Sequence, residues 1–256
     1  MSRRLSSNDS FQNAASDVRL QHAGESFDLE EVVMSRVLLL GVFLTLIIAG
    51  VVACFARGGA NAPLPDPAVD DPISTTKTTQ SAVVAGGCFW GIQAVFQHVK
   101  GVVSATSGYS GGADDTAEYG MVSTGSTGHA ESVKVVYDPS KITYGGLLRV
   151  LFSVGHDPTQ LNRQGPDIGS QYRSAIFYSN DEQRRIAEAY VAQLEAAKIF
   201  AHPIVTQVVP LKGFYPAESY HQNYVERHPN DPYIVYNDAP KLTRLRQQFP
   251  DLYTGK

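Results

Sequence analysis

Cys88 is the residue in this chain whose surroundings most clearly suggest chemistry. It lies in the run Gly-Gly-Cys-Phe-Trp-Gly at 86–91, after a short apolar stretch and before a helix-like stretch at 92–99. A cysteine in the first turn of a helix faces unpaired backbone N–H groups and the positive end of the helix dipole, which together lower the pKa of the thiol. The aromatic side chains of Phe89 and Trp90 can form an apolar wall for a small uncharged group. The pattern favours a reactive thiolate over a buried structural cysteine.

Several polar residues further along the chain are candidates to assist this thiol: Tyr119, His129, Glu131, Asp167, Tyr172 and His221. Each also has a purely structural reading. Glu131 could be a solvated carboxylate at a strand end, Asp167 a loop residue that stabilises a turn, and the tyrosines ordinary half-buried rings. Spacing alone does not bring these residues together.

Composition excludes several classes of protein. The chain has a formal net charge of −4, which gives no reason to expect nucleic-acid binding. Its two cysteines, Cys54 and Cys88, form neither a disulfide framework nor a Cys-x-x-Cys motif. No histidine stands at a metal-ligand spacing from a cysteine, so we expect no metal site.

The N-terminal third does not look like part of a catalytic domain. Residues 1–33 are polar, and disorder is expected there. Residues 37–56, within a segment at 34–57, are almost entirely apolar, and about 20 such residues are enough to span a bilayer. Residues 58–80 are rich in Pro, Ser and Thr and are expected to form an unpacked linker. The catalytic domain is then expected at 81–256.

Two readings of the apolar segment remain open. It is either an uncleaved transmembrane anchor or, if translation begins at Met34, a lipoprotein-type signal in which Cys54 becomes the lipidated N-terminus. In the second case residues 1–33 come from a wrongly assigned start codon. Both readings make the protein membrane-tethered and place the catalytic domain outside the cytoplasm, in the periplasm if the source is bacterial.

The remaining sequence alternates between strand-like and helix-like patterns. Strands are expected at 102–109, 130–137, 172–178 and 204–209, and helices at 144–154 and 240–249. Between them, Ser179 and Glu182 fit a capping box for a helix whose apolar stripe includes Ile186, Tyr190, Leu194 and Lys198. Some strand pairs lack a crossover helix. We therefore expect an α+β fold, a two-layer sandwich with a mixed sheet and a ferredoxin-like core, ending in long irregular C-terminal segments.

Four motifs in order give the chain a family resemblance. They are Gly-Cys-Phe-Trp-Gly at 87–91, Gly-x-Thr-Gly-His-Ala-Glu at 125–131, Asp-x-Gly-x-Gln-Tyr-Arg-Ser at 167–174 and Ala-Glu-x-Tyr-His-Gln at 217–222. This set resembles the A-type peptide methionine sulfoxide reductases over residues 81–249. The resemblance implies thiol-dependent reduction of methionine S-sulfoxide, free or in proteins, and thus repair of oxidised proteins.

The resemblance also implies a role for each candidate residue. Cys88 would attack the sulfoxide sulfur, and Glu131 would protonate the sulfoxide oxygen. Tyr119 and Tyr172 would hydrogen-bond that oxygen, and Asp167 would support the site through water. The residues expected to contact substrate are Phe89 and Trp90, which would hold its methyl group, together with Gly87, His129 and His221.

The chain departs from much of that family in its cysteines. Many members carry a second cysteine that resolves the sulfenic acid, but no cysteine follows Cys88 here, and Ser123 and Thr124 stand where a mid-chain cysteine might be sought. Cys54, in or at the membrane, is a poor resolver. We therefore expect no cofactor beyond an external thiol, such as a small dithiol or a thioredoxin- or glutaredoxin-like partner, and we expect a monomer.

Other function classes make different predictions. A cysteine hydrolase that paired Cys88 with His129 or His221 would form an acyl-enzyme and need no reductant. A non-catalytic binder of oxidised methionine would lack Cys88 or Glu131, and a thiol-disulfide oxidoreductase would carry a neighbouring second cysteine.

Overall fold

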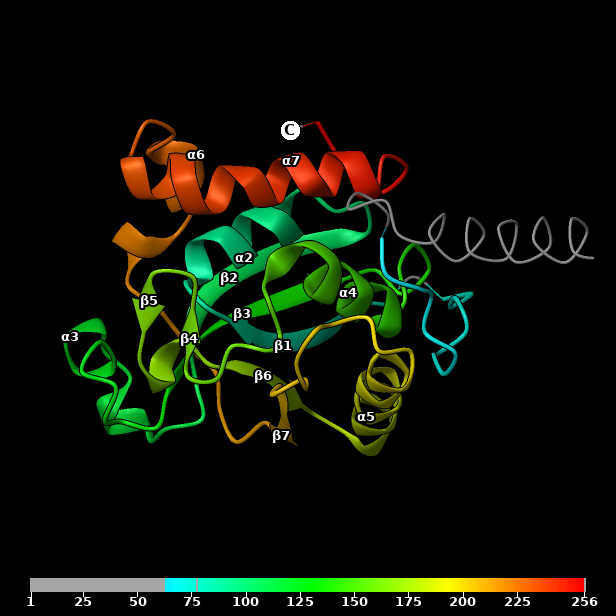
Figure 1. Cartoon of the computed structure of the whole chain (residues 1–256), viewed down its shortest axis with the longest axis horizontal. Helices are drawn as coiled ribbons and strands as arrows, with labels where there is room; N and C mark the ends of the chain where they lie inside the picture. The colour runs from blue at the N-terminus through cyan, green and yellow to red at the C-terminus, as the bar shows by residue number, and fades with distance from the viewer. Residues whose placement is uncertain (1–62, 77, 256) are drawn as a thin grey trace, which may run out of the picture. The chain divides into compact units, whose positions relative to one another are not determined.

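The chain folds around one mixed β-sheet. The computed structural model describes residues 63–76 and 78–255 (Figure 1). Its six-stranded sheet has the order β7-β6-β1-β3-β2-β8, in which only β6 and β7 pair in parallel. The strands are β1 (Gln80–Gly86), β2 (Val102–Ser110), β3 (Ala130–Tyr137), β6 (Ser174–Tyr178), β7 (Gln207–Pro210) and β8 (Tyr215–Pro216), and a separate hairpin joins β4 (Arg163–Gln164) to β5 (Asp167–Ile168).

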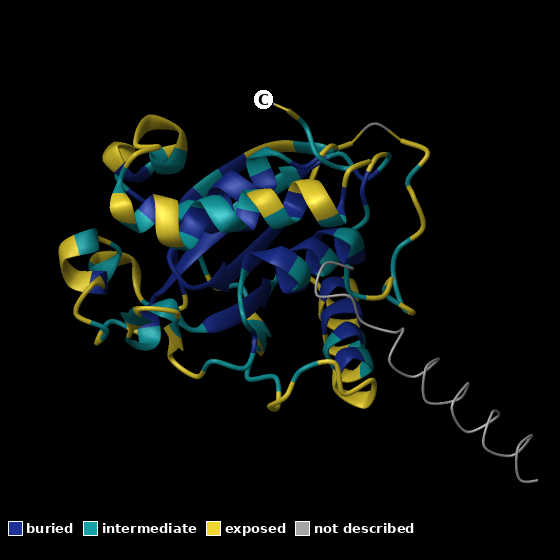
Figure 2. Cartoon of the chain, turned by 45° about the horizontal axis from the view of Figure 1, so that its top comes forward, coloured by how far each residue is buried: buried dark blue, intermediate teal, exposed yellow. Residues whose placement is uncertain are grey.

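The α-helices in the described part of the chain are α2 (Phe89–Gln97), α3 (Tyr119–Val122), α4 (Tyr144–Val150), α5 (Asp181–Ala196), α6 (Tyr224–Arg227) and α7 (Ala239–Gln248), with π-helical turns at Leu151–Gly155 and Ile234–Asp238. The four longest of them bury apolar side chains against one side of this sheet. Side chains from α2, α4, α5 and α7 form one apolar core with alternate residues of β1 and β3. Figure 2 shows this pattern as buried inner and exposed outer faces of the helices.

The opposite face of the sheet is covered by irregular chain. Val83, Ala85 and Phe177 point to this side and pack against Leu211 and Phe214. Successive residues of β1 thus bury themselves in two different clusters, because side chains alternate across a strand. The result is the two-layer α+β sandwich with a mixed sheet that the sequence predicted.

Helix α5 begins one residue later than its predicted capping box implied. Asn180 is the N-cap, and its side chain accepts the backbone N–H of Gln183 at 2.8 Å. The Gln183 side chain in turn accepts the backbone N–H of Ser179 at 2.9 Å. Ser179 and Glu182 therefore do not form the cap. Lys198, predicted to continue the apolar stripe, lies beyond the helix end with a positive φ of 50°.

The segment at 63–76 contradicts the prediction of an unpacked linker. Leu64 and Val69 pack against the core, and the Leu64 carbonyl accepts a hydrogen bond from Arg149. The Asp70 carboxylate accepts bonds from the Thr143 hydroxyl at 2.5 Å and the Gly145 N–H at 2.8 Å. We call residues 63–76 the strap. It packs because Asp70 satisfies a backbone N–H that the start of α4 would otherwise leave unpaired.

The predictions for 1–33 and 34–57, including those for the apolar run 37–56 and for Cys54, fall outside the described residues. Within 63–76 and 78–255, none of the helices has the length and apolar character needed to cross a bilayer.

Candidate active site

Cys88 lies where β1 gives way to α2. It is the N-cap residue of α2, and its side chain is only 7% exposed. The preceding Gly87 has a φ of +92°, and a methyl group there would lie 2.5 Å from Cγ of Gln164. Only glycine allows this turn and this close approach. Gly87 thus acts through the backbone, by setting the position of the sulfur.

Glu131 stands next to Cys88 on the neighbouring strand. In β3 it pairs across to Tyr109 of β2, and its side chain is 3% exposed. Its Oε2 accepts the backbone N–H of Phe89, the residue that follows Cys88, at 3.0 Å. Burial, with the nearby carboxyls of Asp167 and Asp238, raises the pKa of Glu131 to about 8. A carboxyl with that pKa carries a proton at neutral pH and can act as an acid.

The sequence predicted a lowered pKa for Cys88, and this prediction is wrong for the free enzyme. Burial, followed by the Glu131 and Asp238 carboxyls, raises the pKa of Cys88 well above its ordinary value. The Trp90 backbone N–H and the Lys241 ammonium act in the opposite direction but are outweighed. The helix N-terminus is present as expected. Desolvation of the sulfur decides the outcome, so the resting group is a thiol.

An aromatic wall lies beside these two residues. Trp90 stacks on Tyr224 with ring centroids 3.7 Å apart, and its indole N–H donates to Nδ1 of His221 at 3.2 Å. The His221 ring lies 5.0 Å from the Phe89 ring and 4.5 Å from the Tyr119 ring. Phe89, Trp90 and Tyr119 therefore meet around His221, which holds Trp90 in place.

The two predicted tyrosines and Asp167 face the same centre. Burial raises the pKa of Tyr119 and of Tyr172, and Glu131 and Cys88 contribute to both increases. Both phenols are therefore protonated and can donate a hydrogen bond. Asp167 accepts a hydrogen bond from the Tyr233 hydroxyl at 2.5 Å.

His129 is not part of this group. Its Nδ1 accepts the Gly112 N–H at 3.2 Å, and its Nε2 donates to the Ala113 carbonyl at 2.8 Å. Because both ring nitrogens are engaged, His129 fastens a loop and the predicted substrate contact is not supported. His221 Nδ1 is likewise occupied by Trp90. In a hydrolase triad, one ring nitrogen of the histidine contacts the nucleophile and the other contacts a carboxylate. Neither His129 nor His221 has both ring nitrogens available for these contacts.

Sequence reasoning missed residues that hold the site from the C-terminal segments. Glu218 accepts the Tyr109 hydroxyl and the Tyr119 backbone N–H, each at 2.8 Å. It belongs to the Ala-Glu-x-Tyr-His-Gln motif, which was the available signal. Asp238 is fully buried, and its Oδ1 accepts Nζ of Lys241 at 3.0 Å beside Gly91 of α2. No pattern in the sequence distinguished this ion pair.

In the described part of the chain, no three His, Cys, Asp or Glu side chains gather as metal ligands. A buried thiol and a protonated carboxyl, both next to aromatic rings and two phenols, are the groups with which a cysteine can attack an uncharged substrate whose oxygen takes up a proton.

The comparisons with known proteins give this class its family. Residues 80–253 match the family model described as peptide methionine sulfoxide reductase. The chain is 61% identical to "Peptide methionine sulfoxide reductase MsrA 2" of Mesorhizobium japonicum over 178 residues, 70% of this chain and 91% of that protein. It is 54% identical to the protein of the same name from Synechocystis over 190 residues, 73% of this chain and 89% of that protein.

Solved structures agree. Methionine sulfoxide reductase A of Corynebacterium diphtheriae is similar at a TM-score of 0.51 and 33% identity, covering 67% of this chain and 90% of that one. Reduced Mxr1 from Saccharomyces cerevisiae is similar at a TM-score of 0.54 and 32% identity, covering 62% and 90%. The chain belongs to the peptide methionine sulfoxide reductase family. It is an oxidoreductase that reduces methionine sulfoxide at the expense of a thiol.

Proposed function

We propose that Cys88 is the nucleophile and Glu131 the general acid of this reduction. The observation that carries the proposal is a buried site in which the Glu131 carboxyl, with a pKa of about 8, accepts the backbone N–H of Phe89, the residue that follows Cys88. A sulfoxide becomes a good electrophile only when its oxygen is protonated, and Glu131 holds a proton for that step at neutral pH.

The chemistry balances over two half-reactions. Cys88 attacks the sulfoxide sulfur while Glu131 protonates the oxygen, and the thiol proton of Cys88 replaces the one that Glu131 gives up; two electrons pass from Cys88 to the substrate. Methionine leaves, and Cys88 keeps the oxygen as a sulfenic acid. Because the thiol pKa is raised in the free site, the loss of its proton is coupled to substrate binding rather than complete beforehand.

The surrounding residues orient the sulfoxide. Phe89 and Trp90, which pack against His221, form the apolar surface that holds the substrate methyl group. Tyr119 and Tyr172 donate hydrogen bonds to the oxygen as charge develops on it. Asp167, fixed by Tyr233, supports the site from behind these groups.

An external thiol then regenerates Cys88. Cys88 is the single cysteine among the described residues, and Cys54 is the one other cysteine in the chain. A first thiol displaces water from the sulfenic acid, and a second releases the resulting mixed disulfide. A thioredoxin- or glutaredoxin-like protein or a small dithiol can supply both equivalents.

We further propose that the protein is a monomer, tethered to a membrane through residues 37–56, with its catalytic domain outside the cytoplasm. The apolar sequence of that segment supports the tether.

The test is turnover of a methionine S-sulfoxide peptide by the full chain, with and without dithiothreitol. We expect continuous turnover with the thiol, a single methionine per enzyme without it, and none in C88S. Product formation by C88S, or repeated turnover without a thiol, would exclude this mechanism.

A further inference from the structure

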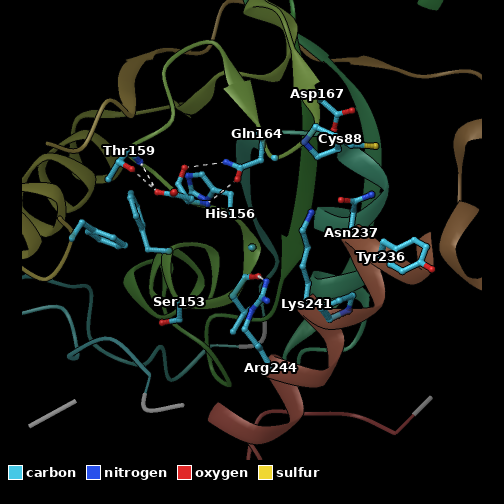
Figure 3. Close-up of a pocket in the computed structure, with 18 of the residues that line it drawn as sticks. Cys88, Ser153, His156, Thr159, Gln164, Asp167, Tyr236, Asn237, Lys241 and Arg244 are labelled. Carbon is cyan, nitrogen blue, oxygen red and sulfur yellow. Dashed lines mark hydrogen bonds between the residues drawn. The ribbon is translucent and has the colours of Figure 1, made fainter. Parts of the chain in front are cut away.

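A cavity adjoins Cys88, and the aromatic residues grouped around His221 do not line it. It has a volume of about 520 Å³, within the range of small-molecule sites. Figure 3 shows Cys88 and Asp167 toward one end of the view, Arg244 toward the other, and Lys241 between them. Glu131, Phe89 and Trp90 do not line this cavity. Of the residues assigned to the sulfoxide site, Cys88 and Asp167 line this cavity, so the cavity adjoins that site at its Cys88 end.

One positive charge in this cavity has no carboxylate partner in the described part of the chain. Arg244 is half-buried, and its guanidinium donates a long hydrogen bond of 3.4 Å to the Val154 carbonyl. Lys241, in contrast, already pairs with Asp238 at 3.0 Å. Partial burial of a guanidinium without a carboxylate is unfavourable, and a bound anion would offset it.

The other titratable side chains of the cavity do not neutralise Arg244. Asp157 already accepts bonds from Thr159 at 2.7 Å and Gln160 at 3.0 Å. Burial lowers the pKa of His156 to about 4, so this ring is neutral at physiological pH. Asp167 is hydrogen-bonded to Tyr233 at the Cys88 end. His202 also lines the cavity, from an exposed turn, and adds no negative charge.

We propose that this cavity binds the reductant as a low-molecular-weight thiol that carries a carboxylate, with the carboxylate at Arg244 and the sulfur directed at Cys88. The inference rests on the proposed recycling of Cys88 by an external thiol. The bound thiol attacks the sulfenic sulfur, an S–S bond forms, and the oxygen leaves as water. A second thiol molecule then attacks the mixed disulfide, takes up the first thiol as a symmetrical disulfide and returns Cys88 as a thiol.

The test compares two small thiols, mercaptopropionate and mercaptoethanol, that differ in whether they carry a carboxylate. Each is added to enzyme that has first released one methionine, and the rate of sulfenic-acid loss is measured. The proteins are the native chain, R244M, R244K and the matched control R246M, which alters an exposed arginine on the same helix. Comparing the ratio of the two rate constants between proteins cancels the difference in thiol acidity.

We expect R244M to lower the mercaptopropionate-to-mercaptoethanol ratio by on the order of tenfold, as for the loss of one charge-assisted hydrogen bond. R246M should keep the native ratio, and R244K should keep most of it. An equal ratio in all four proteins would overturn the proposal. It would also be overturned if R244M raised the KM for the sulfoxide and left the ratio unchanged, because the cavity would then serve the substrate.

Two further measurements keep the result interpretable. Methionine release before thiol addition is recorded for every protein, so a failure of the sulfoxide step is separated from a failure of reductant binding. Should R244M not fold, propionate is tested on the native chain as a competitor that has the carboxylate but no sulfur. Propionate should raise the apparent KM for mercaptopropionate, and no competition would overturn the proposal.

Discussion

Cys88 and Glu131 are protonated for the same reason. Both lie in a site from which water is excluded, and burial is the main cause of the raised pKa of each. The carboxyls of Glu131 and Asp238 raise the pKa of Cys88 further, because two neighbouring negative charges are costly there. The free site therefore holds a proton on each group, so that Glu131 can protonate the sulfoxide oxygen and the Cys88 proton can replace the one that Glu131 gives up.

Glu131→Gln tests the acid directly. Removing the transferable proton should slow methionine release in a single turnover by on the order of 10²–10⁴-fold. In the native chain this rate should fall as pH rises through about 8, where Glu131 loses its proton, and the variant should lack that fall. Rapid-quench measurement of methionine across this range gives both results. A variant that matched the native rate at low and neutral pH would remove Glu131 from the mechanism.

The same substitution should change how stability depends on pH. The native pKa of Glu131, about 8, exceeds its ordinary value of 4.5, so the folded chain binds a proton that the unfolded chain has lost between these values. Stability from this group therefore falls as pH rises through the window. Between about pH 5 and pH 8, the free energy of unfolding measured in urea should fall by on the order of 3 kcal/mol more for the native chain than for E131Q. Parallel stability curves would contradict the raised pKa.

At the scale of elements, the first turn of α2 is held by a helix distant in sequence. A methyl group at Gly91 would overlap Oδ1 of Asp238 and lie 2.7 Å from Nζ of Lys241. The buried ion pair between Asp238, the N-cap residue of α7, and Lys241 within α7 therefore packs directly against α2, the helix capped by Cys88. This contact limits movement of the helix turn that follows Cys88.

Gly91→Ala should displace that ion pair. We expect it to destabilise the fold by about 2–3 kcal/mol, as overpacking does, and to slow the sulfoxide step. Gly120→Ala is the control, because no atom lies within 4 Å of a methyl group there. Thermal unfolding and single-turnover rates of both variants provide the check. Equal effects at the two positions would show that Asp238 is not packed against Gly91.

The site could be predicted from sequence where its residues come from regular elements. The strand at 130–137 and the helix after Cys88 follow from local pattern, and the pairing of β1 with β3 then brings Cys88 and Glu131 together. The pKa of Cys88 could not be predicted, because it depends on burial and on Asp238, more than a hundred residues away. His129 was misassigned because the sequence does not show that the loop at 112–113 uses both of its ring nitrogens.

For the whole molecule, the strap changes where the catalytic domain begins. Its prolines and small residues suggested an unpacked linker, since such composition carries no periodic apolar pattern. The contacts that anchor it are single side chains. Arg149 binds the Leu64 carbonyl, the Tyr190 hydroxyl binds the Pro65 carbonyl, and Asp70 binds the start of α4.

Asp70→Ala should release the middle of the strap. The loss of two hydrogen bonds to a carboxylate, one of them from the Gly145 N–H, should lower stability by about 1–3 kcal/mol. The active-site contacts are unaffected, so kcat should stay near the native value. Asp115→Ala, at an exposed position, serves as control. Unfolding in urea measures the difference, and identical midpoints would mean that the strap contributes nothing to the fold.

In the proposed membrane-bound protein, the strap also limits the distance between the catalytic domain and the membrane. A fully extended linker over residues 58–80 would allow a distance of up to about 80 Å, at roughly 3.4 Å per residue. Because Leu64 is fastened to the domain, residues 58–63 could span at most about 20 Å between the apolar segment and the domain. The active site of such an enzyme would stay close to the bilayer surface. The oxidised methionines that it repairs would then be selected by their nearness to that surface more than by the sequence around them.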